Sequence, residues 1–263
     1  PLAFLVPGLF LVAVRPMRPR RAALWGFIFG GVWGCTMAGW MYQASLAYFG
    51  FNRALAALFV LVVSFGYAGI PNALLAGAYS FAAPRFSLAW RGLVGAWLWA
   101  ASELLRGHVF SGLPWELLAH TQFENLRLLQ IADLGGAYAV SFLIALVSVT
   151  VAELLVEIRA GDVAFSGVVR RLGPSAAVLA AVLAYGAWCE SMYGEAPGDD
   201  APTVAVVQGN IPNSLRWKRE YFDRNVVRYA QLTARAKGRP SWIVWPENAI
   251  NFYADQEPTL FPV

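Results

Sequence analysis

Long apolar segments joined by short arginine-bearing connections fill the first 192 residues, and they restrict this part of the chain to a polytopic α-helical membrane domain. Hydrophobic residues make up 58% of the sequence and charged residues only 14%, against roughly a quarter charged in soluble domains. A spanning helix needs about 20 apolar residues. We therefore expect about six spans, the first of them partial: Pro1–Val14, Ala22–Leu46, Leu55–Phe81, Phe86–Leu105, Ile131–Val156 and Pro174–Met192.

The arginines indicate how these spans are oriented. Counted over alternate connections, three arginines fall on one side, namely Arg53, Arg106 and Arg127. Nine fall on the other side: Arg15, Arg18, Arg20, Arg21, Arg85, Arg91, Arg159, Arg170 and Arg171. Cytoplasmic connections carry the excess of positive charge. The side with nine arginines should therefore be cytoplasmic, and everything after the last span should be extracytoplasmic, which is periplasmic in a diderm bacterium.

Several residues within the spans have structural interpretations. Gly26, Gly30 and Gly34 recur every four residues, a spacing that lets a neighbouring helix approach closely. Glu103 and Arg106 are three apart, which favours a structural pair on one helix face.

Three other carboxylates lie near helix ends, where we expect water to solvate them: Asp133, Glu153 and Glu157. Cys35 and Cys189 lie in apolar runs and are expected to be packing thiols. No spacing predicts a metal site or a cofactor, and no basic patch with interleaved aromatics predicts nucleic-acid binding.

The composition changes after the last span. Residues 193–202 are rich in Gly, Pro and Asp and are typical of a linker, which leaves 203–263 as a soluble domain. Thr203–Gln208 and Trp242–Trp245 are short runs of strand-forming residues, the second predicted to be a buried strand. Between them, Arg216–Lys237 carries apolar residues at helical spacing. Strand, helix and strand predict a βαβ-like unit whose polar strand ends meet at one edge.

Glu247 is the strongest catalytic candidate in this unit. Pro246 should end the second strand because it cannot donate to the ladder, which leaves Glu247 just beyond the carboxyl end, where α/β sheets bind ligands. Its carboxylate could accept a proton there. It could equally cap a turn, since single carboxylates after strands are common.

Two motifs together carry a family resemblance. Val207-Gln208-Gly209-Asn210-Ile211-Pro212, continued by Ser214-Leu215 and Trp217-Lys218, is followed by Trp245-Pro246-Glu247. Behind a polytopic membrane domain, this pattern resembles the start of the nitrilase-type domain of the apolipoprotein N-acyltransferases of the bacterial inner membrane. The membrane part adds Leu113-Pro114-Trp115 and the run from Gly135 to Leu143.

The resemblance implies an αββα sandwich in which Cys is the nucleophile, Glu the base and Lys the stabiliser of the tetrahedral intermediate. Glu247 matches the base, and Trp217 matches a tryptophan on an arm beside the active site. Trp115 would line the path of the lipid tails, or else simply anchor its loop among the headgroups. The implied partners are a phospholipid acyl donor and a diacylated apolipoprotein acceptor, without a cofactor.

The chain also departs from the family pattern. The family's Lys and Cys lie well downstream of Trp-Pro-Glu, whereas this chain ends sixteen residues after Glu247. The family is expected to have eight spans, so we expect a fragment that lacks the first span and most of the catalytic domain. Such a fragment should be inactive alone. Two alternatives remain open: a membrane-tethered nitrilase-type amidohydrolase and a non-catalytic membrane scaffold.

Overall fold

The computed structural model of the chain describes residues 2–109, 111–161, 165–193, 198 and 201–250. Its contacts divide the chain into two compact units, Pro1–Glu195 (unit 1) and Ala196–Val263 (unit 2). Most of the predicted linker, 193–202, lies outside the described residues, as does the end of the predicted soluble domain, 251–263.

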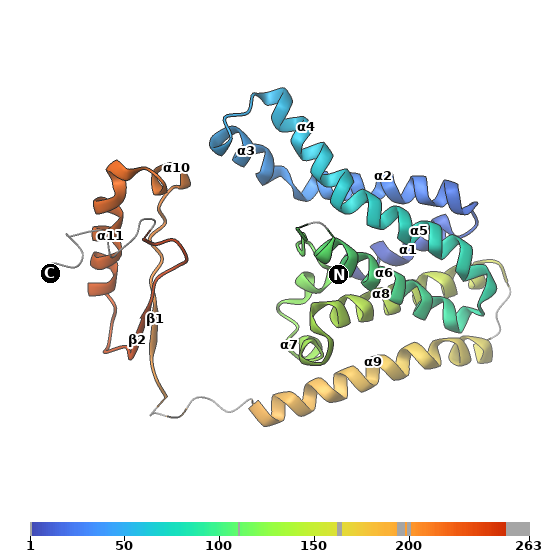
Figure 1. Cartoon of the computed structure of the whole chain (residues 1–263). Helices are drawn as coiled ribbons and strands as arrows, with labels where there is room; N and C mark the ends of the chain where they lie inside the picture. Colours follow the sequence, from blue (N-terminus) through green and yellow to red (C-terminus); the bar gives the residue numbers. More distant parts are fainter. Residues whose placement is uncertain (1, 110, 162–164, 194–197, 199–200, 251–263) are drawn as a thin grey trace. The chain divides into compact units, whose positions relative to one another are not determined.

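Unit 1 is a bundle of helices around an apolar core (Figure 1). Leu11, Tyr79 and Leu146, from three different helices, are completely buried at its centre. Its long helices are α1 (Val6–Val14), α2 (Pro19–Met37), α3 (Gly39–Tyr48), α4 (Arg53–Ser64), α5 (Ile70–Ala82), α6 (Leu88–His108), α8 (Ala132–Arg159) and α9 (Phe165–Tyr193). Shorter elements are η1 (Leu2–Phe4), η2 (Phe65–Gly69), η3 (Ala83–Arg85), η4 (Leu118–Gln122) and α7 (Leu126–Leu129).

Within the described ranges, three helices are long and apolar enough to cross a membrane: Arg53–Arg85, Ala132–Arg159 and Arg171–Met192. The bent pair α2 and α3, with an angle of 59° between them, makes a fourth if it counts as one span. Two predicted spans are not in this set. Leu2–Val14 is too short, and α6 carries Arg91, Glu103 and Arg106 along its 21 residues.

The glycines of α2 pack directly against the α4–α5 segment, as their spacing predicts. A Cβ on Gly30 would lie 2.8 Å from the Asn72 Cβ, and one on Gly34 would lie 2.9 Å from the Ser64 Cβ. Gly26 meets Ala76 in the same way, at 2.8 Å. The helices therefore approach so closely that side chains at these positions are excluded. A π-helical turn, η2, precedes Pro71 in the facing helix, and π-bulges and prolines are both places where helices kink.

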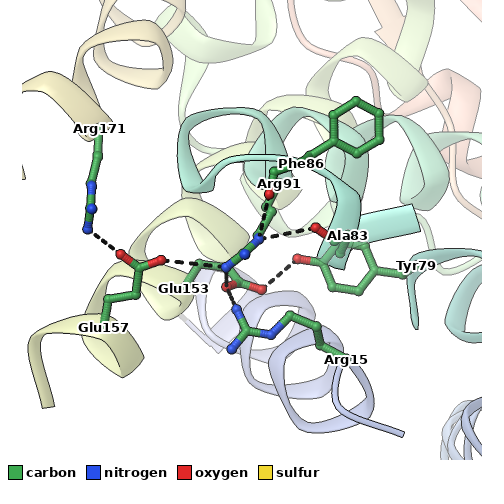
Figure 2. A network of polar contacts seen from close by, with 8 residues as sticks. All are labelled: Arg15, Tyr79, Ala83, Phe86, Arg91, Glu153, Glu157 and Arg171. Carbon is green, nitrogen blue, oxygen red and sulfur yellow. Dashed lines mark hydrogen bonds and ion pairs between the residues drawn. The ribbon is translucent and has the colours of Figure 1, made fainter. Parts of the chain in front are cut away.

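A cluster of charged side chains joins five helices of unit 1 and corrects one prediction (Figure 2). Glu153 of α8 is not solvated, because its side chain is 0% exposed. It pairs with Arg15 of α1 and with Arg91 of α6, the latter at 3.4 Å. Tyr79 of α5 donates a hydrogen bond of 2.8 Å to the same carboxylate.

Glu157, one turn further along α8, continues this cluster. It lies 3.5 Å from Arg91 and pairs with Arg171 of α9, and its side chain is 19% exposed. Asp133 at the other end of α8 is exposed, as predicted, and accepts a hydrogen bond of 2.7 Å from Tyr185. This charge cluster therefore lies at one end of α8, and Asp133 lies at the other.

Unit 2 contains the predicted βαβ arrangement. Strand β1 (Val204–Val206) is followed by α10 (Asn213–Arg216), η5 (Arg219–Tyr221), α11 (Phe222–Ala234) and β2 (Trp242–Val244). The strands are parallel, and Val206 lies opposite Val244. The prediction of a buried second strand was wrong, since Trp242, Ile243 and Val244 are between 45 and 66% exposed. A sheet of two strands, with α11 packed at their carboxyl ends, leaves most of β2 uncovered.

Candidate functional site

The carboxyl ends of β1 and β2 form one edge of the sheet, because the two strands are parallel and in register. The Val207 amide donates to the Val244 carbonyl at 2.9 Å, which carries the pairing one residue beyond the strands. The segments that follow, 208–210 and 245–248, therefore leave the sheet side by side. Ligands of α/β proteins bind at such an edge.

Both segments turn through an asparagine in the left-handed region, where asparagine is better tolerated than other non-glycine residues. Asn210 has φ 49° and Asn248 has φ 58°. The Asn210 side-chain oxygen Oδ1 accepts a hydrogen bond of 2.8 Å from the Gln208 side-chain nitrogen Nε2. Pro246 has no N–H to donate to a ladder, and its carbonyl accepts from the Ala249 amide at 3.1 Å. In both motifs the backbone therefore turns within a few residues after the strand ends.

Helix α11 closes this edge from one side. Tyr229 is 1% exposed, and its ring stacks on Trp245 with centroids 5.2 Å apart. Trp245 donates through Nε1 to the Thr233 hydroxyl at 2.9 Å. A Cβ on Gly209 would lie 2.6 Å from the Tyr229 ring. Only glycine lets the first motif pass so close to this ring.

The edge opens into a cleft of about 620 Å³, a size typical of small-ligand sites. The lining residues are Val206, Val207, Gln208, Gly209, Asn210, Ile211, Arg216, Tyr229, Val244, Trp245 and Pro246. Glu247 and Trp217 are not among them. Each directly follows a lining residue, Pro246 and Arg216 respectively. The fold thus brings residues of both sequence motifs to the cleft, and Glu247 and Trp217 are next to lining residues in the chain.

Glu247 and Trp217 are both accessible. The Glu247 side chain is exposed, and its Oε1 accepts a hydrogen bond of 3.3 Å from Asn248. Trp217 is 53% exposed and lies between α10 and η5, where the chain turns into α11. Their proposed roles as base and as substrate contact remain predictions.

Sequence reasoning missed two residues of the cleft, Tyr229 and Arg216. Tyr229 could have been found from its position seven residues after Phe222, because both lie on the buried face of α11. Val227 and Ala230, which are also apolar, are exposed, so apolar character alone does not identify the buried face of this helix. Arg216 gave no distinct signal, since it is one of several charged residues in its segment.

Trp115, the third predicted site residue, belongs to unit 1. It lies in the connection between α6 and η4, is 46% exposed, and meets the Trp40 ring of α3 edge-on at 5.1 Å. The same connection contacts the bundle through Ser111, whose hydroxyl lies 2.9 Å from the Tyr67 hydroxyl. Trp115 is thus presented on an anchored loop, and its contact with lipid remains a prediction.

The predicted pairing of Glu103 with Arg106 was wrong, because the two side chains bond to other groups. Glu103 accepts from the Trp99 indole at 3.1 Å and from the Leu118 amide at 3.0 Å. Arg106 donates to the Glu116 carbonyl at 3.2 Å. Groups of the neighbouring loop are better placed to form hydrogen bonds with these two side chains than the two side chains are to pair with each other.

The two cysteines are free thiols of unit 1, Cys35 in α2 and Cys189 buried in α9. Both lysines, Lys218 and Lys237, are exposed in unit 2. Among the described residues, no group of three or more His, Cys, Asp or Glu side chains could hold a metal ion.

Comparison with known proteins gives a consistent result. A family model described as the apolipoprotein N-acyltransferase N-terminal domain matches residues 1–150. Proteins named apolipoprotein N-acyltransferase are 32% identical to the chain over 245 residues in Nitrosomonas europaea and 30% over 273 residues in Geobacter metallireducens. These alignments cover 93% and 98% of this chain but 46% and 49% of the two relatives. The chain thus spans about half the length of the curated relatives it matches. On these matches, the chain belongs to the apolipoprotein N-acyltransferase family.

Proposed function

We propose that the chain forms the membrane part and the start of the catalytic domain of an enzyme that acylates apolipoproteins. The enzyme would move a fatty acyl chain from a phospholipid to the α-amino group of an N-terminal diacylglyceryl-cysteine. Family membership supports the reaction class. The observation that carries the assignment of a site is the cleft of unit 2, where the segments bearing Trp217 and Glu247 meet.

The proposed reaction has two acyl transfers through a thioester. Glu247 takes the proton of a cysteine thiol, and the thiolate attacks the ester carbonyl of the phospholipid. The lysophospholipid alkoxide leaves and takes the proton back. The apolipoprotein amine then attacks the thioester and loses its proton to Glu247. The C–S bond breaks as the amide forms, and the released thiolate takes that proton back. Cys35 and Cys189 lie in helices of unit 1, so we assign the nucleophile, with the lysine, to the half of the relatives that this chain does not cover.

We further propose a multi-pass arrangement in the bacterial inner membrane with unit 2 in the periplasm. The excess of arginine on one set of connections supports this orientation. A cysteine introduced at Glu220, which is exposed in unit 2, should react with a membrane-impermeant thiol reagent in spheroplasts. A cysteine introduced at Arg18 should react only after the cells are permeabilised. The opposite labelling pattern would overturn the orientation.

The experiment that tests the function compares Glu247→Gln with the matched control Glu220→Gln in the complete protein. Phospholipid vesicles supply the acyl donor, a diacylated lipopeptide is the acceptor, and N-acylation is read as a mass shift. Loss of a general base should lower the rate by about 10²- to 10⁴-fold, while the control retains transfer. Near wild-type transfer in Glu247→Gln would remove Glu247 from the mechanism. No transfer in the wild type would favour an amidohydrolase or a scaffold.

The two tryptophans are tested in the same assay. Trp217→Ala and Trp115→Ala should raise the KM for one of the two lipid substrates, because each is proposed to contact substrate. Trp90→Ala is a matched control, since Trp90 is 59% exposed near the other end of α6. Unchanged KM values in both test variants would refute the proposed substrate contacts.

A further inference from the structure

The loop that carries Trp115 is tied to the end of α6 by a set of directed hydrogen bonds. The Leu113 amide donates to the Arg106 carbonyl at 2.9 Å. Beyond Trp115, the Glu116 carbonyl accepts from the Arg106 guanidinium, and the Leu118 amide donates to the Glu103 carboxylate. A backbone hydrogen bond therefore holds the loop before Trp115, and two charged side chains, one turn apart on α6, hold it after Trp115.

The backbone next to Trp115 needs such support. Glu116 has φ 62°, and a non-glycine residue adopts this conformation only where the surroundings impose it. The Arg106 contact falls on the carbonyl of this same residue. Without it, we expect the segment to relax toward an ordinary conformation and to carry the neighbouring Trp115 ring away from Trp40.

Glu103 and Arg106 are deeply buried, at 4 and 7% exposure, so their contacts are isolated from bulk solvent. Glu103 Oε2 and Arg106 Nε, together with Asn72 Oδ1, have no hydrogen-bond partner within the described part of the protein. All three residues line one cavity of about 20 Å³, which has room for a single water molecule. A water molecule there can satisfy buried polar atoms without disturbing the bonds that Glu103 and Arg106 make to the loop.

We propose that Glu103 and Arg106 are positioning residues that hold the loop of Trp115 in place for the lipid substrate. The restraint of the loop by this pair follows from the contacts above, and its importance for lipid binding rests on the proposed function. Neither side chain touches the reacting atoms. Hydrogen bonds to charged groups are about twice as strong as neutral ones, so these two side chains restrain the loop backbone more than neutral side chains would.

The first test is hydrogen exchange in the complete protein, followed by mass spectrometry over residues 113–119. Glu103→Ala and Arg106→Ala should each accelerate exchange there by about tenfold or more, the factor expected from losing a hydrogen bond to a charged group. Glu103→Gln should give a smaller increase, because its amide oxygen still accepts from the Leu118 amide. Glu153→Gln is the matched control: it neutralises an equally buried glutamate at the other end of the bundle and should leave exchange over 113–119 unchanged.

The second test separates positioning from chemistry in the acyl-transfer assay. The two alanine variants should raise the KM for a lipid substrate at least as much as Trp115→Ala does, with a smaller change in kcat. Unchanged exchange over 113–119 in both alanine variants would overturn the proposal. Acceleration of the same size in Glu153→Gln would also overturn it, because that result would indicate a general loosening of the bundle. A wild type without transfer would refute the proposed function, while the exchange result would still decide whether the loop is held by this pair.

Discussion

Replacing Gly30 by alanine tests the helix contact on which unit 1 is built. The new Cβ would lie 2.3 Å from the Ala68 carbonyl oxygen and 2.8 Å from the Asn72 Cβ, and ordinary van der Waals contact begins at 3.4 Å. The α2 and α4–α5 backbones would therefore have to separate by about 1 Å. A gap of that size removes about half of the dispersion energy of the affected contacts. Overpacking of this kind destabilises a fold by about 1–3 kcal/mol.

The assay is the free energy of unfolding in a titration with denaturing detergent, with helix content as the signal. Gly66→Ala is the matched control, because a Cβ on Gly66 meets nothing within 4 Å. It should be neutral or stabilising by up to about 1 kcal/mol, since alanine is the better helix former. If Gly30→Ala unfolds at the same free energy as Gly66→Ala, the close approach of α2 does not stabilise the bundle and the reasoning fails.

Three further predictions concern other contacts. Glu153→Ala should destabilise unit 1 by about 3–5 kcal/mol, because it leaves two arginines without their buried carboxylate, whereas Glu157→Ala should cost less in the same unfolding titration. Burial raises the pKa of the Glu116 carboxyl above its ordinary value of 4.5, and this effect is larger than the lowering by the nearby Arg106 guanidinium. The protonated carboxyl therefore stabilises the fold below pH 4.5, and this contribution to stability is lost as the pH rises through the raised pKa. Glu116→Gln should therefore raise Tm at neutral pH, with a gap to wild type that closes toward pH 4. Gly209→Ala should accelerate amide exchange in β1 and β2, because the Cβ would displace the Tyr229 ring; exchange at the wild-type rate would contradict that contact.

Periodic features of the sequence predicted much of this fold. Four-residue spacing located the glycine face of α2, and apolar runs located most helices to within a few residues, although α9 begins at Phe165, nine residues before the predicted start at Pro174. Strand, helix and strand correctly predicted the parallel pair in unit 2. These features are local, because each depends on residues within one or two turns of each other.

The failures involve partners that are far apart in the chain. Glu153 was expected in water because it lies near the end of a helix, whereas its partner Arg15 lies 138 residues earlier in the chain. Helical spacing predicted that Glu103 pairs with Arg106. Both side chains instead form hydrogen bonds with backbone groups that lie ten to fifteen residues later in the chain. In the candidate site, the strand ends could be predicted, but Tyr229 and Arg216 could not be assigned to the cleft without the packing of α11 and the turn before it.

The buried carboxylate of Glu153 also has a consequence for biogenesis. Arg15, Tyr79 and Arg91 all precede it in the chain, and synthesis proceeds from the amino terminus. When the ribosome delivers α8 to the insertion machinery, every partner of this glutamate has already been made. The Glu153 carboxylate can therefore form its ion pairs as α8 packs into the bundle, without first being exposed to the bilayer as an unpaired charge. Arg171, which arrives last, then only has to dock α9 against Glu157.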